Sequence, residues 1–499
     1  MKGKVYLVGA GPGDTKLITL KGLECIKKSD VIIYDRLAND EFLKEAKDGC
    51  EFIYVGKKSS NHILPQDKIN ELILQKCLEG KVVTRLKGGD PYVFGRGGEE
   101  AEKLFDNGVD FEIVPGITSA IGGLCYAGIP ITHRDYASSF HVITGHLRDD
   151  EEKEINWNAL ANCKGTLVFL MGIGNLKHIS EELIKEGRDK KTPVALISWA
   201  TRYNQNTTIT DLENAYEIAK EKNVKAPSLI VVGDVVKVRN KLNFFENSAL
   251  FGKKVVVTRA RKQSSYLSDK IKLLGGKAVE LPVIKIEKNN NQKLKKEIEN
   301  IKEYTHIVFT SRNGVEIFFE TIDEMGLDSR IFFNLKVCSI GMGTSEELMK
   351  RGIKADIVPK KFVAESLFDE MKKTLIKTDK VLVPRSENAR DFLVDKLKEI
   401  CKVKELYTYR TIIDEKSIEI AEKVLEEDID YITFTSSSTV KNLISILGNN
   451  YKDMLLNKKL ISIGPITSKT IEEFGLKVYK ESHIATIDGL VDLLIEDNK

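Results

Sequence analysis

The sequence predicts an α/β protein in which short apolar strands alternate with helical segments. Two observations carry this prediction. The chain opens with an apolar strand, a glycine-rich loop, a helical segment and a second buried strand, which is the order of a nucleotide-binding βαβ unit. In the second half, three strand-and-turn motifs occur twice at nearly one spacing, which indicates two similar lobes. The length of 499 residues allows three or four domain-sized units.

Charge and composition exclude several classes of protein. The chain has 77 Lys and Arg against 74 Asp and Glu, so its net charge of +3 gives no overall attraction to nucleic acid or to a membrane surface. No apolar run approaches the ~18 residues of a membrane span. The seven cysteines are scattered and include no CxxC pair, so they signal neither a zinc site nor a disulfide framework. The first residues lack the apolar core of a secretion signal. We expect a cytoplasmic protein without a metal, a nucleic-acid partner or a membrane partner.

The first glycine-rich loop differs from a dinucleotide-binding loop. The opening strand, residues 4–8, ends in GAGPGD at residues 9–14, and the next strand ends at Asp35. A diphosphate needs free backbone amides at a helix N-terminus, whereas Pro12 removes an amide and Asp14 adds a negative charge. The loop therefore favours a cationic or zwitterionic cofactor. A nicotinamide-dependent oxidoreductase remains the alternative for this half.

A second loop, within residues 81–100 (KVVTRLKGGDPYVFGRGGEE), is the most informative stretch of the chain. An apolar strand stops at Gly88-Gly89-Asp90-Pro91, a turn in which no Cβ keeps a ligand from the backbone. Pro91 also stiffens the turn. A further glycine group, residues 95–98, precedes the start of a helix. An ordinary strand-to-helix connection is the alternative, but five glycines, an aromatic pair and an arginine favour a ligand-binding loop.

Several other polar residues follow predicted strands. Asp35 and Lys57 each lie at a strand end, where open α/β sheets place their sites. From position alone, a solvated cap and a surface charge are equally good interpretations. Thr118 and Ser119 open a helix, where they could cap the helix or contact a ligand.

The motifs of the first half combine into a specific resemblance. GAGPGD, YDRL, VGK, RLKGGDPYVFGRGGEE, VPGITSA, GIPITHR, VFLMG and APSLIVVGDVV follow one another over residues 1–246. Together they resemble uroporphyrinogen-III C-methyltransferase, of the tetrapyrrole methylase family. The resemblance implies the tetrapyrrole methylase fold, with two α/β subdomains at about 1–114 and 115–240. It also implies S-adenosyl-L-methionine bound between the subdomains, and a homodimer formed through this half.

The resemblance assigns roles to individual positions. The implied proton acceptor and donor are Asp35 and Lys57. The implied cofactor contacts are Pro12, Gly88, Gly89, Asp90, Val93, Thr118, Ser119, Met171, Ala200 and Ala226. S-adenosylmethionine has a sulfonium, an adenine and an amino acid head but no phosphate, so an apolar slot with exposed backbone groups suits it. The Asp90 carboxylate could contact its polar groups.

A uroporphyrinogen substrate carries eight carboxylates, so cations should line its cleft. Cationic side chains in the appropriate stretches are Arg36, Lys57, Lys58, Arg85, Lys87, Arg96, His133 and Arg134. Each alone is more often a solvated surface charge, so only the cluster as a whole indicates a cleft for this substrate. We expect Arg36, Arg96 and Arg134 to bind substrate.

The domain boundary falls at residues 240–252, where strand and helix periodicity is lost, with the linker at 247–252. Beyond it lies an internal repeat of three motifs, at lags of 126, 125 and 123 residues. KKVVVTR (253–259) recurs as DKVLVPR (379–385), IVFTS (307–311) as ITFTS (432–436), and CSIGMGT (338–344) as ISIGPIT (461–467). Strands that end in Ser, Thr, Gly or Arg provide many donors, and two such lobes facing each other would form a cleft for carboxylates.

The second half, residues 253–499, resembles uroporphyrinogen-III synthase through VTRA, FTSRNGV, IGMGT, AESL, VPRSENAR, YTYRT, FTSSSTV and IGPITS. The resemblance implies a bilobed domain of two Rossmann-like lobes, at about 253–286 plus 413–499 and at 287–412, and no cofactor. Tyr409 matches the family tyrosine that assists loss of the substrate hydroxyl; a tyrosine packed between lobes is the alternative. Candidate substrate-binding residues are Arg259, Thr310, Ser311, Gly341, Arg385, Thr435, Ser436, Gly464 and Thr467.

The sequence therefore predicts a bifunctional enzyme of tetrapyrrole biosynthesis. Its second half would cyclise hydroxymethylbilane to uroporphyrinogen III, inverting the last ring. Its first half would methylate this product at C2 and C7 to precorrin-2, from which both sirohaem and cobalamin-type corrinoids derive. The alternative is an oxidoreductase first half joined to a non-catalytic bilobed binding module.

Overall fold

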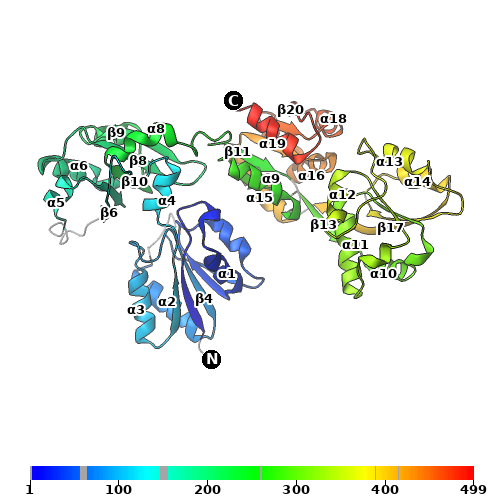
Figure 1. Cartoon of the computed structure of the whole chain (residues 1–499), viewed down its shortest axis with the longest axis horizontal. Helices are drawn as coiled ribbons and strands as arrows, with labels where there is room; N and C mark the ends of the chain where they lie inside the picture. The colour runs from blue at the N-terminus through cyan, green and yellow to red at the C-terminus, as the bar shows by residue number, and fades with distance from the viewer. Residues whose placement is uncertain are drawn as a thin grey trace. The chain divides into compact units, whose positions relative to one another are not determined.

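The computed structural model describes residues 3–56, 64–145, 155–258, 261–281, 283–387, 389–413 and 415–499. It divides into two compact units (Figure 1). The first comprises Met1–Lys253 with the short segments Lys270–Lys277 and Leu494–Lys499, and the second comprises Lys254–Asp269 and Ala278–Leu493. The described residues form four five-stranded sheets connected by helices, so the predicted α/β class is confirmed. None of their helices is both long and apolar enough to span a membrane.

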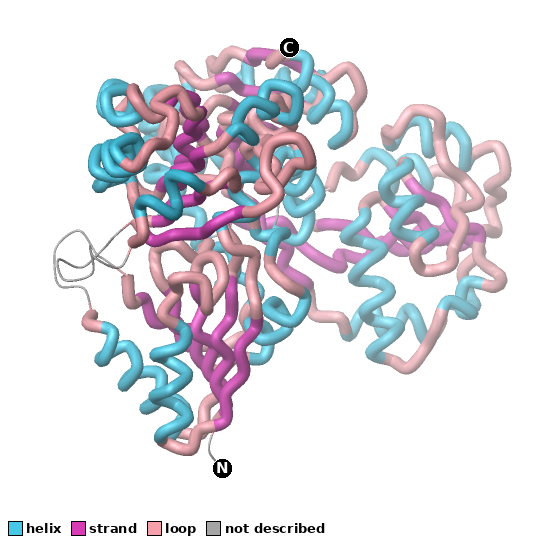
Figure 2. Tube along the Cα trace, turned by 60° about the vertical axis from the view of Figure 1, so that its left-hand side comes forward, coloured by secondary structure: helices cyan, strands magenta, loops and turns pink. Residues whose placement is uncertain are grey.

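The first sheet is wholly parallel, with the strand order β3-β2-β4-β1-β5. Figure 2 shows its strands side by side above the N-terminus. The carboxyl ends of parallel strands share one edge, which brings together the loops that follow these strands. The strands are β1 (Lys4–Gly9), β2 (Val31–Tyr34), β3 (Glu51–Tyr54), β4 (Val82–Lys87) and β5 (Asp110–Val114); the helices are α1 (Leu20–Lys28), α2 (Gln66–Leu78) and α3 (Gly97–Asp106).

The second sheet is mixed, with the order β6-β7-β10-β8-β9 and only β6 and β7 parallel. Helix α4 follows the first sheet along the chain, yet its Ala120 and Leu124 pack in the core of the second sheet. This helix therefore fixes the two subdomains relative to each other. The strands are β6 (Phe140–Thr144), β7 (Thr166–Leu170), β8 (Pro193–Ser198), β9 (Asn206–Asp211) and β10 (Ser228–Val232); the helices are α4 (Ser119–Tyr126), α5 (Trp157–Asn162), α6 (Leu176–Lys185), α7 (Ala215–Glu221) and α8 (Arg239–Leu242).

The third sheet, β12-β11-β18-β19-β20, forms one lobe of the second unit. Its strands are β11 (Lys254–Val257), β12 (Lys277–Glu280), β18 (Tyr431–Phe434), β19 (Lys459–Ser462) and β20 (Val478–Glu481). Its helices are α9 (Arg261–Leu273), α15 (Glu415–Glu426), α16 (Ser437–Leu447), α17 (Tyr451–Leu455), α18 (Pro465–Glu473) and α19 (Ile487–Glu496).

The fourth sheet, β13-β17-β16-β14-β15, forms the other lobe. Its strands are β13 (Ile284–Lys288), β14 (His306–Phe309), β15 (Lys336–Ser339), β16 (Lys380–Ser386) and β17 (Lys402–Ile413); its helices are α10 (Gln292–Glu299), α11 (Arg312–Glu324), α12 (Met342–Met349), α13 (Ala364–Met371) and α14 (Phe392–Lys398). Short 3-10 turns are Thr15–Leu17, Asp40–Glu45, Ile173–Asn175, Asp234–Val238, Ile301–Glu303, Ser329–Phe332 and Gly448–Asn450.

The two lobes are built alike, as the repeat predicts. The order β11-β18-β19 in one lobe corresponds to β16-β14-β15 in the other, and all these pairings are parallel. Ser311 and Ser436, which match in the repeat, both adopt an extended conformation and cap helices α11 and α16 through their side chains. The repeated residues thus begin equivalent helices at equivalent strand ends.

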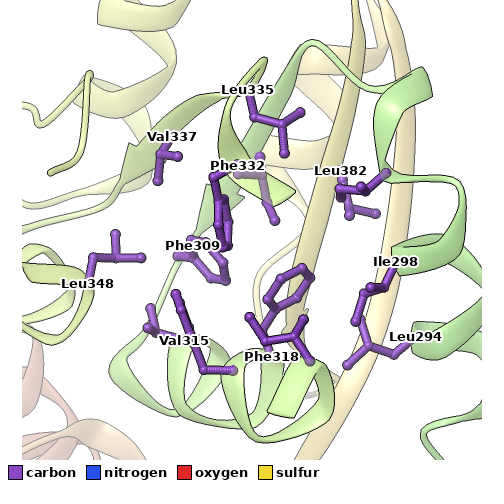
Figure 3. Close-up of a cluster of buried hydrophobic side chains, with 14 of the residues drawn as sticks. Leu294, Ile298, Phe309, Val315, Phe318, Phe332, Leu335, Val337, Leu348 and Leu382 are labelled. Carbon is purple, nitrogen blue, oxygen red and sulfur yellow. The ribbon is translucent and has the colours of Figure 1, made fainter. Parts of the chain in front are cut away.

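An aromatic core supports the lobe that carries Tyr409. Phe309, Phe318 and Phe332 pack together, with ring centroids 5.5 Å apart for the first pair and 5.7 Å for the last two (Figure 3). Full burial of one phenylalanine side chain contributes about 1.5–3 kcal/mol. Since Phe309 is the last residue of β14, this core fixes the strand end from which Thr310 and Ser311 project.

Candidate functional site

The two glycine-rich loops of the first half are joined through their backbones. The Gly11 N–H donates to the Gly89 carbonyl at 3.2 Å, and the Gly89 N–H donates to the Gly11 carbonyl at 2.8 Å. Gly116, after β5, approaches so closely that a Cβ there would lie 2.2 Å from the Gly89 oxygen. The glycines at the ends of β1, β4 and β5 therefore pack against one another through backbone atoms, with no side chain between them.

A Cβ on Gly89 would meet no steric overlap at this junction. Its φ of +71° is in the left-handed region, yet a Cβ would meet nothing closer than the Thr118 Cα at 3.9 Å and the Ser119 nitrogen at 4.0 Å. Gly88 differs, because a Cβ there would strike the side chain of Leu37 at 2.6 Å. Thr118 caps helix α4 by accepting the Ala120 N–H. The main chain of Gly89 and the start of α4 thus adjoin with no side-chain atom among the nearest neighbours of that Cβ.

Asp90 holds this loop in place. Its Oδ1 accepts the Tyr92 N–H at 2.8 Å, and its Oδ2 accepts the Gly116 N–H at 2.9 Å. Both oxygens are therefore used by backbone donors, which gives Asp90 a structural role. Its direct contact with a cofactor stays a prediction.

Asp14 is likewise engaged within the protein. Its Oδ2 accepts the Tyr126 hydroxyl at 2.7 Å, and its N–H donates to Thr201 Oγ1 at 3.0 Å. Burial and the hydrogen bond to Asp14 raise the pKa of Tyr126. Asp14 therefore contacts both helix α4 and the loop after β8, and these contacts connect the GAGPGD loop to the second subdomain.

The remaining predicted cofactor contacts gather around α4 and one edge of the second sheet. A Cβ on Gly122 would lie 3.1 Å from Pro12, and a Cβ on Gly123 would lie 2.9 Å from the Ala200 side chain, so α4 contacts both residues. Met171 follows β7, Ala200 follows β8 and Ala226 precedes β10; the pairing of these strands places the three residues at the same edge. Met171 is half-exposed with φ +58°. Val93 is partly buried within the GGDP loop.

Asp35 belongs to a buried chain of charges. Its Oδ2 forms an ion pair with Arg85 at 3.0 Å, and its Oδ1 accepts the Leu37 N–H. Glu100, on α3, accepts from Arg85 Nε at 3.2 Å and from Lys87 Nζ at 2.7 Å. Its side chain is fully buried, so these cations compensate its charge. Glu100 was not among the predicted site residues; its position in the first turn of a helix after a basic strand was the available signal.

For two of the cations that were expected to line the substrate cleft, the prediction is wrong. Arg85 and Lys87 are only 5% exposed and both bind Glu100, so they are not available to a substrate. Burial, followed by the charge of Arg85, lowers the pKa of Lys87. Residues i and i+2 of a strand point to one side, and here that side faces α3 rather than the solvent.

The other predicted cations of the first half have different surroundings. Arg96 forms a bidentate ion pair with Glu99, which raises the pKa of Arg96. Arg36 and Arg134 are exposed. Lys57, Lys58 and Arg259 lie outside the described residues.

In the second half, Tyr409 and Ser311 come together. Tyr409, on β17, is 4% exposed, and its hydroxyl lies 2.8 Å from Ser311 Oγ. Ser311 Oγ also accepts the Gly314 N–H at the start of α11. Burial raises the pKa of Tyr409, although its hydrogen bonds to Ser311, Asn313 and Ser386 oppose the shift. The hydroxyl therefore stays protonated and can act as a donor.

Most of the other candidates lie at strand ends, as expected. Arg385 is instead almost fully buried, with Nη1 2.8 Å from Glu405 and Nη2 3.1 Å from Asp391. Its guanidinium is thus held by two carboxylates, and substrate binding by Arg385 stays a prediction. Thr310, Ser311, Gly341, Thr435, Ser436 and Gly464 follow β14, β15, β18 or β19, whereas Thr467 is buried in the first turn of α18.

The folds and sites define an α/β enzyme with two functional halves, and comparison with known proteins identifies both. Residues 4–216 match the family profile of the Tetrapyrrole (Corrin/Porphyrin) Methylases, and residues 265–492 match Uroporphyrinogen-III synthase HemD. A Ruminiclostridium josui protein described as porphyrin biosynthesis protein HemD is 39% identical over 99% of this chain and 98% of its own length. The chain belongs to this family, with a tetrapyrrole methylase first half and a uroporphyrinogen-III synthase second half.

Two further relatives match the first half. Uroporphyrinogen-III C-methyltransferase of Priestia megaterium is 52% identical over 47% of this chain and 98% of its own. A crystal structure of uroporphyrin-III C-methyltransferase from Thermus thermophilus, complexed with S-adenosyl homocysteine, is 38% identical over 47% of this chain and 94% of its own, with a TM-score of 0.41. The chain is accordingly an enzyme of porphyrin biosynthesis with a methyltransferase half.

Proposed function

We propose that this enzyme catalyses two consecutive steps. The second half closes hydroxymethylbilane to uroporphyrinogen III with inversion of the last ring, and the first half methylates that product at C2 and C7 to precorrin-2. One observation carries the proposal: a single chain combines a uroporphyrinogen-III synthase with a methylase that resembles enzymes acting on uroporphyrinogen III. The same combination extends over 99% of the chain in one relative.

The first half provides the surroundings that methyl transfer needs. S-adenosylmethionine supplies an activated methyl group, so the protein has mainly to align the two reactants and manage one proton. The bare main chain at Gly89 and at the start of α4 suits a cofactor that contacts backbone groups. Asp35 is proposed to accept the proton, since Arg85 holds its carboxylate at the strand end. The assignment of Lys57 as proton donor stays a prediction.

In the second half, we assign Tyr409 to hydroxyl loss. Its raised pKa keeps the phenol protonated, so it can donate a hydrogen bond to the departing hydroxyl of the linear substrate. Ser311 fixes the phenol oxygen from one side. Hydroxyl groups at the ends of β14 and β18 would bind the substrate carboxylates.

The test is an incubation of the purified chain with hydroxymethylbilane, with and without S-adenosylmethionine. Porphyrin isomers and methylated products are then separated. The proposal predicts type III isomer without the cofactor and dimethylated product with it. Type I isomer alone in both reactions would contradict the synthase assignment, and unmethylated type III isomer in the presence of cofactor would contradict the methyltransferase assignment.

We also propose a cytoplasmic homodimer formed through the first half. Light scattering on the full chain after size-exclusion chromatography should give twice the mass of 56.1 kDa. A monomeric mass at micromolar concentration would contradict the dimer, and recovery in another cell fraction would contradict the location.

A further inference from the structure

Two arginines lie against one tryptophan ring where the two subdomains meet. The guanidinium carbon of Arg36, after β2, lies 5.7 Å from the centroid of the Trp199 ring, and that of Arg202 lies 5.3 Å from the same centroid. Trp199 and Arg202 follow β8 of the second sheet, so the group combines both subdomains. A cation within about 6 Å of an indole is attracted to the ring, but two neighbouring cations repel each other.

Neither arginine has an acidic partner among the described residues. No hydrogen bond or ion pair there engages the Arg36 guanidinium, and Arg202 donates only to the Leu37 carbonyl, at 3.3 Å. This differs from Arg85, Arg96 and Arg385, each of which binds a carboxylate. Burial lowers the pKa of Arg202; Asp40 and Glu41 oppose this effect, while Arg36 adds to it. An exposed guanidinium beside a partly buried one, neither with a carboxylate among the described residues, forms a place where an anion would be stabilised.

The protein fixes this group rigidly. Trp199 and Thr201 have φ values of +49° and +66°, and left-handed backbone in a β-branched residue is costly. Thr201 is held by the Gln205 side chain and accepts the N–H of Asp14. A Cβ on Gly13 would lie 2.8 Å from the Arg202 Cγ, so the glycine permits the arginine to pass the GAGPGD loop.

We propose that Arg36, Trp199 and Arg202 form a carboxylate clamp that binds acidic side chains of the tetrapyrrole beside the cofactor loop. The proposal rests on the proposed methyltransferase function and adds two residues to its substrate site. The guanidinium groups supply planar donors for carboxylates, and the indole supplies an apolar face for the adjoining methylene groups or pyrrole ring. The clamp would favour substrates with acidic side chains over those with methyl groups at the same positions.

The test compares Arg202→Gln with wild-type enzyme in methylation of supplied uroporphyrinogen III. We expect KM for the tetrapyrrole to rise about tenfold while kcat stays within about twofold. The affinity for S-adenosyl homocysteine, measured by calorimetry, should not change. The tetrapyrrole KM of Arg202→Lys should lie between those of the wild type and Arg202→Gln, because lysine keeps the positive charge but lacks the planar, two-pronged guanidinium. Arg188→Gln is the matched control, since Arg188 is also partly buried in the second subdomain and donates to backbone carbonyls.

Two results would overturn the clamp. The first is an unchanged KM in Arg202→Gln. The second is weakened binding of S-adenosyl homocysteine with unaltered tetrapyrrole KM, which would make Arg202 a support of the GAGPGD loop. If Arg202→Gln does not fold, Trp199→Leu and Arg202→Lys provide the same comparison. Failure of wild-type enzyme to methylate uroporphyrinogen III would instead refute the proposed function, so the two failures are distinguishable.

Discussion

Replacing Gly89 with alanine should weaken cofactor binding while leaving the protein folded, so it tests the two roles of this glycine separately. Gly89 has φ +71°, so any side chain there costs about 1–2 kcal/mol. No atom lies closer than 3.9 Å to the added methyl, so steric overlap adds nothing to this cost. For a unit of this size, the loss corresponds to a decrease in Tm of about 2–8 °C. The protein should therefore fold, because domains are stable by about 5–15 kcal/mol.

The methyl group would nevertheless occupy the space between Gly89 and the start of α4, where we place the cofactor. We expect the affinity for S-adenosyl homocysteine to fall at least tenfold, which is about 1.4 kcal/mol. Calorimetric titration of the full chain measures this change, and cyclisation of hydroxymethylbilane by the other half should be unaffected. Gly89→Val should abolish binding.

Two neighbouring glycines serve as controls. Gly98, in the first turn of α3, has open space within 4 Å of where a Cβ would lie, so Gly98→Ala should retain cofactor affinity and gain up to about 1 kcal/mol in helix stability. Gly116→Ala should unfold the first half, since its Cβ would lie 2.2 Å from the Gly89 oxygen. Unchanged cofactor affinity in folded Gly89→Ala would refute the reasoning and leave the turn a structural feature alone.

Three further predictions concern the buried polar groups. Tyr409→Phe should slow cyclisation without affecting methylation of supplied uroporphyrinogen III; an unchanged cyclisation rate would assign Tyr409 to packing. Glu100→Gln should destabilise the first half by about 3–5 kcal/mol, because Lys87 loses its carboxylate partner and Arg85 keeps only Asp35. Both tryptophans, Trp157 and Trp199, lie in that half, so fluorescence during urea unfolding measures the loss, and an unchanged midpoint would contradict it. Burial lowers the pKa of His306, so the unfolded state binds a proton first and the second half should lose stability as pH falls below about 6.5. Calorimetry should show a flatter pH dependence of stability in His306→Gln than in the wild-type chain.

The sequence predicted where the loops of the site lie better than it predicted which partners their side chains bind. Gly89 and Thr118 could be placed near each other because parallel strands end at one edge. Ser311 and Ser436 could be placed at equivalent helix starts in the two lobes because the repeat aligns them. The partners of Asp90 could not be inferred, since its acceptor role depends on how near the end of β5 comes. The proposed clamp was also missed, because its arginines meet only when α4 packs on the second sheet.

The position of an arginine relative to its strand explains which cations remain available. Arg85 and Arg385 lie within strands whose surroundings are buried, where an unpaired charge costs several kcal/mol, and each binds a carboxylate of the protein. Arg36 and Arg202 lie in loops beyond a strand end, where water reduces the cost of a charge without a partner. Arginines within a strand are therefore structural, whereas arginines that follow a strand are candidates for ligand binding. This distinction selects Arg36 and Arg202 as cations through which the first half would hold an acidic tetrapyrrole, whereas Arg134, between α4 and β6, stays a candidate from the sequence alone.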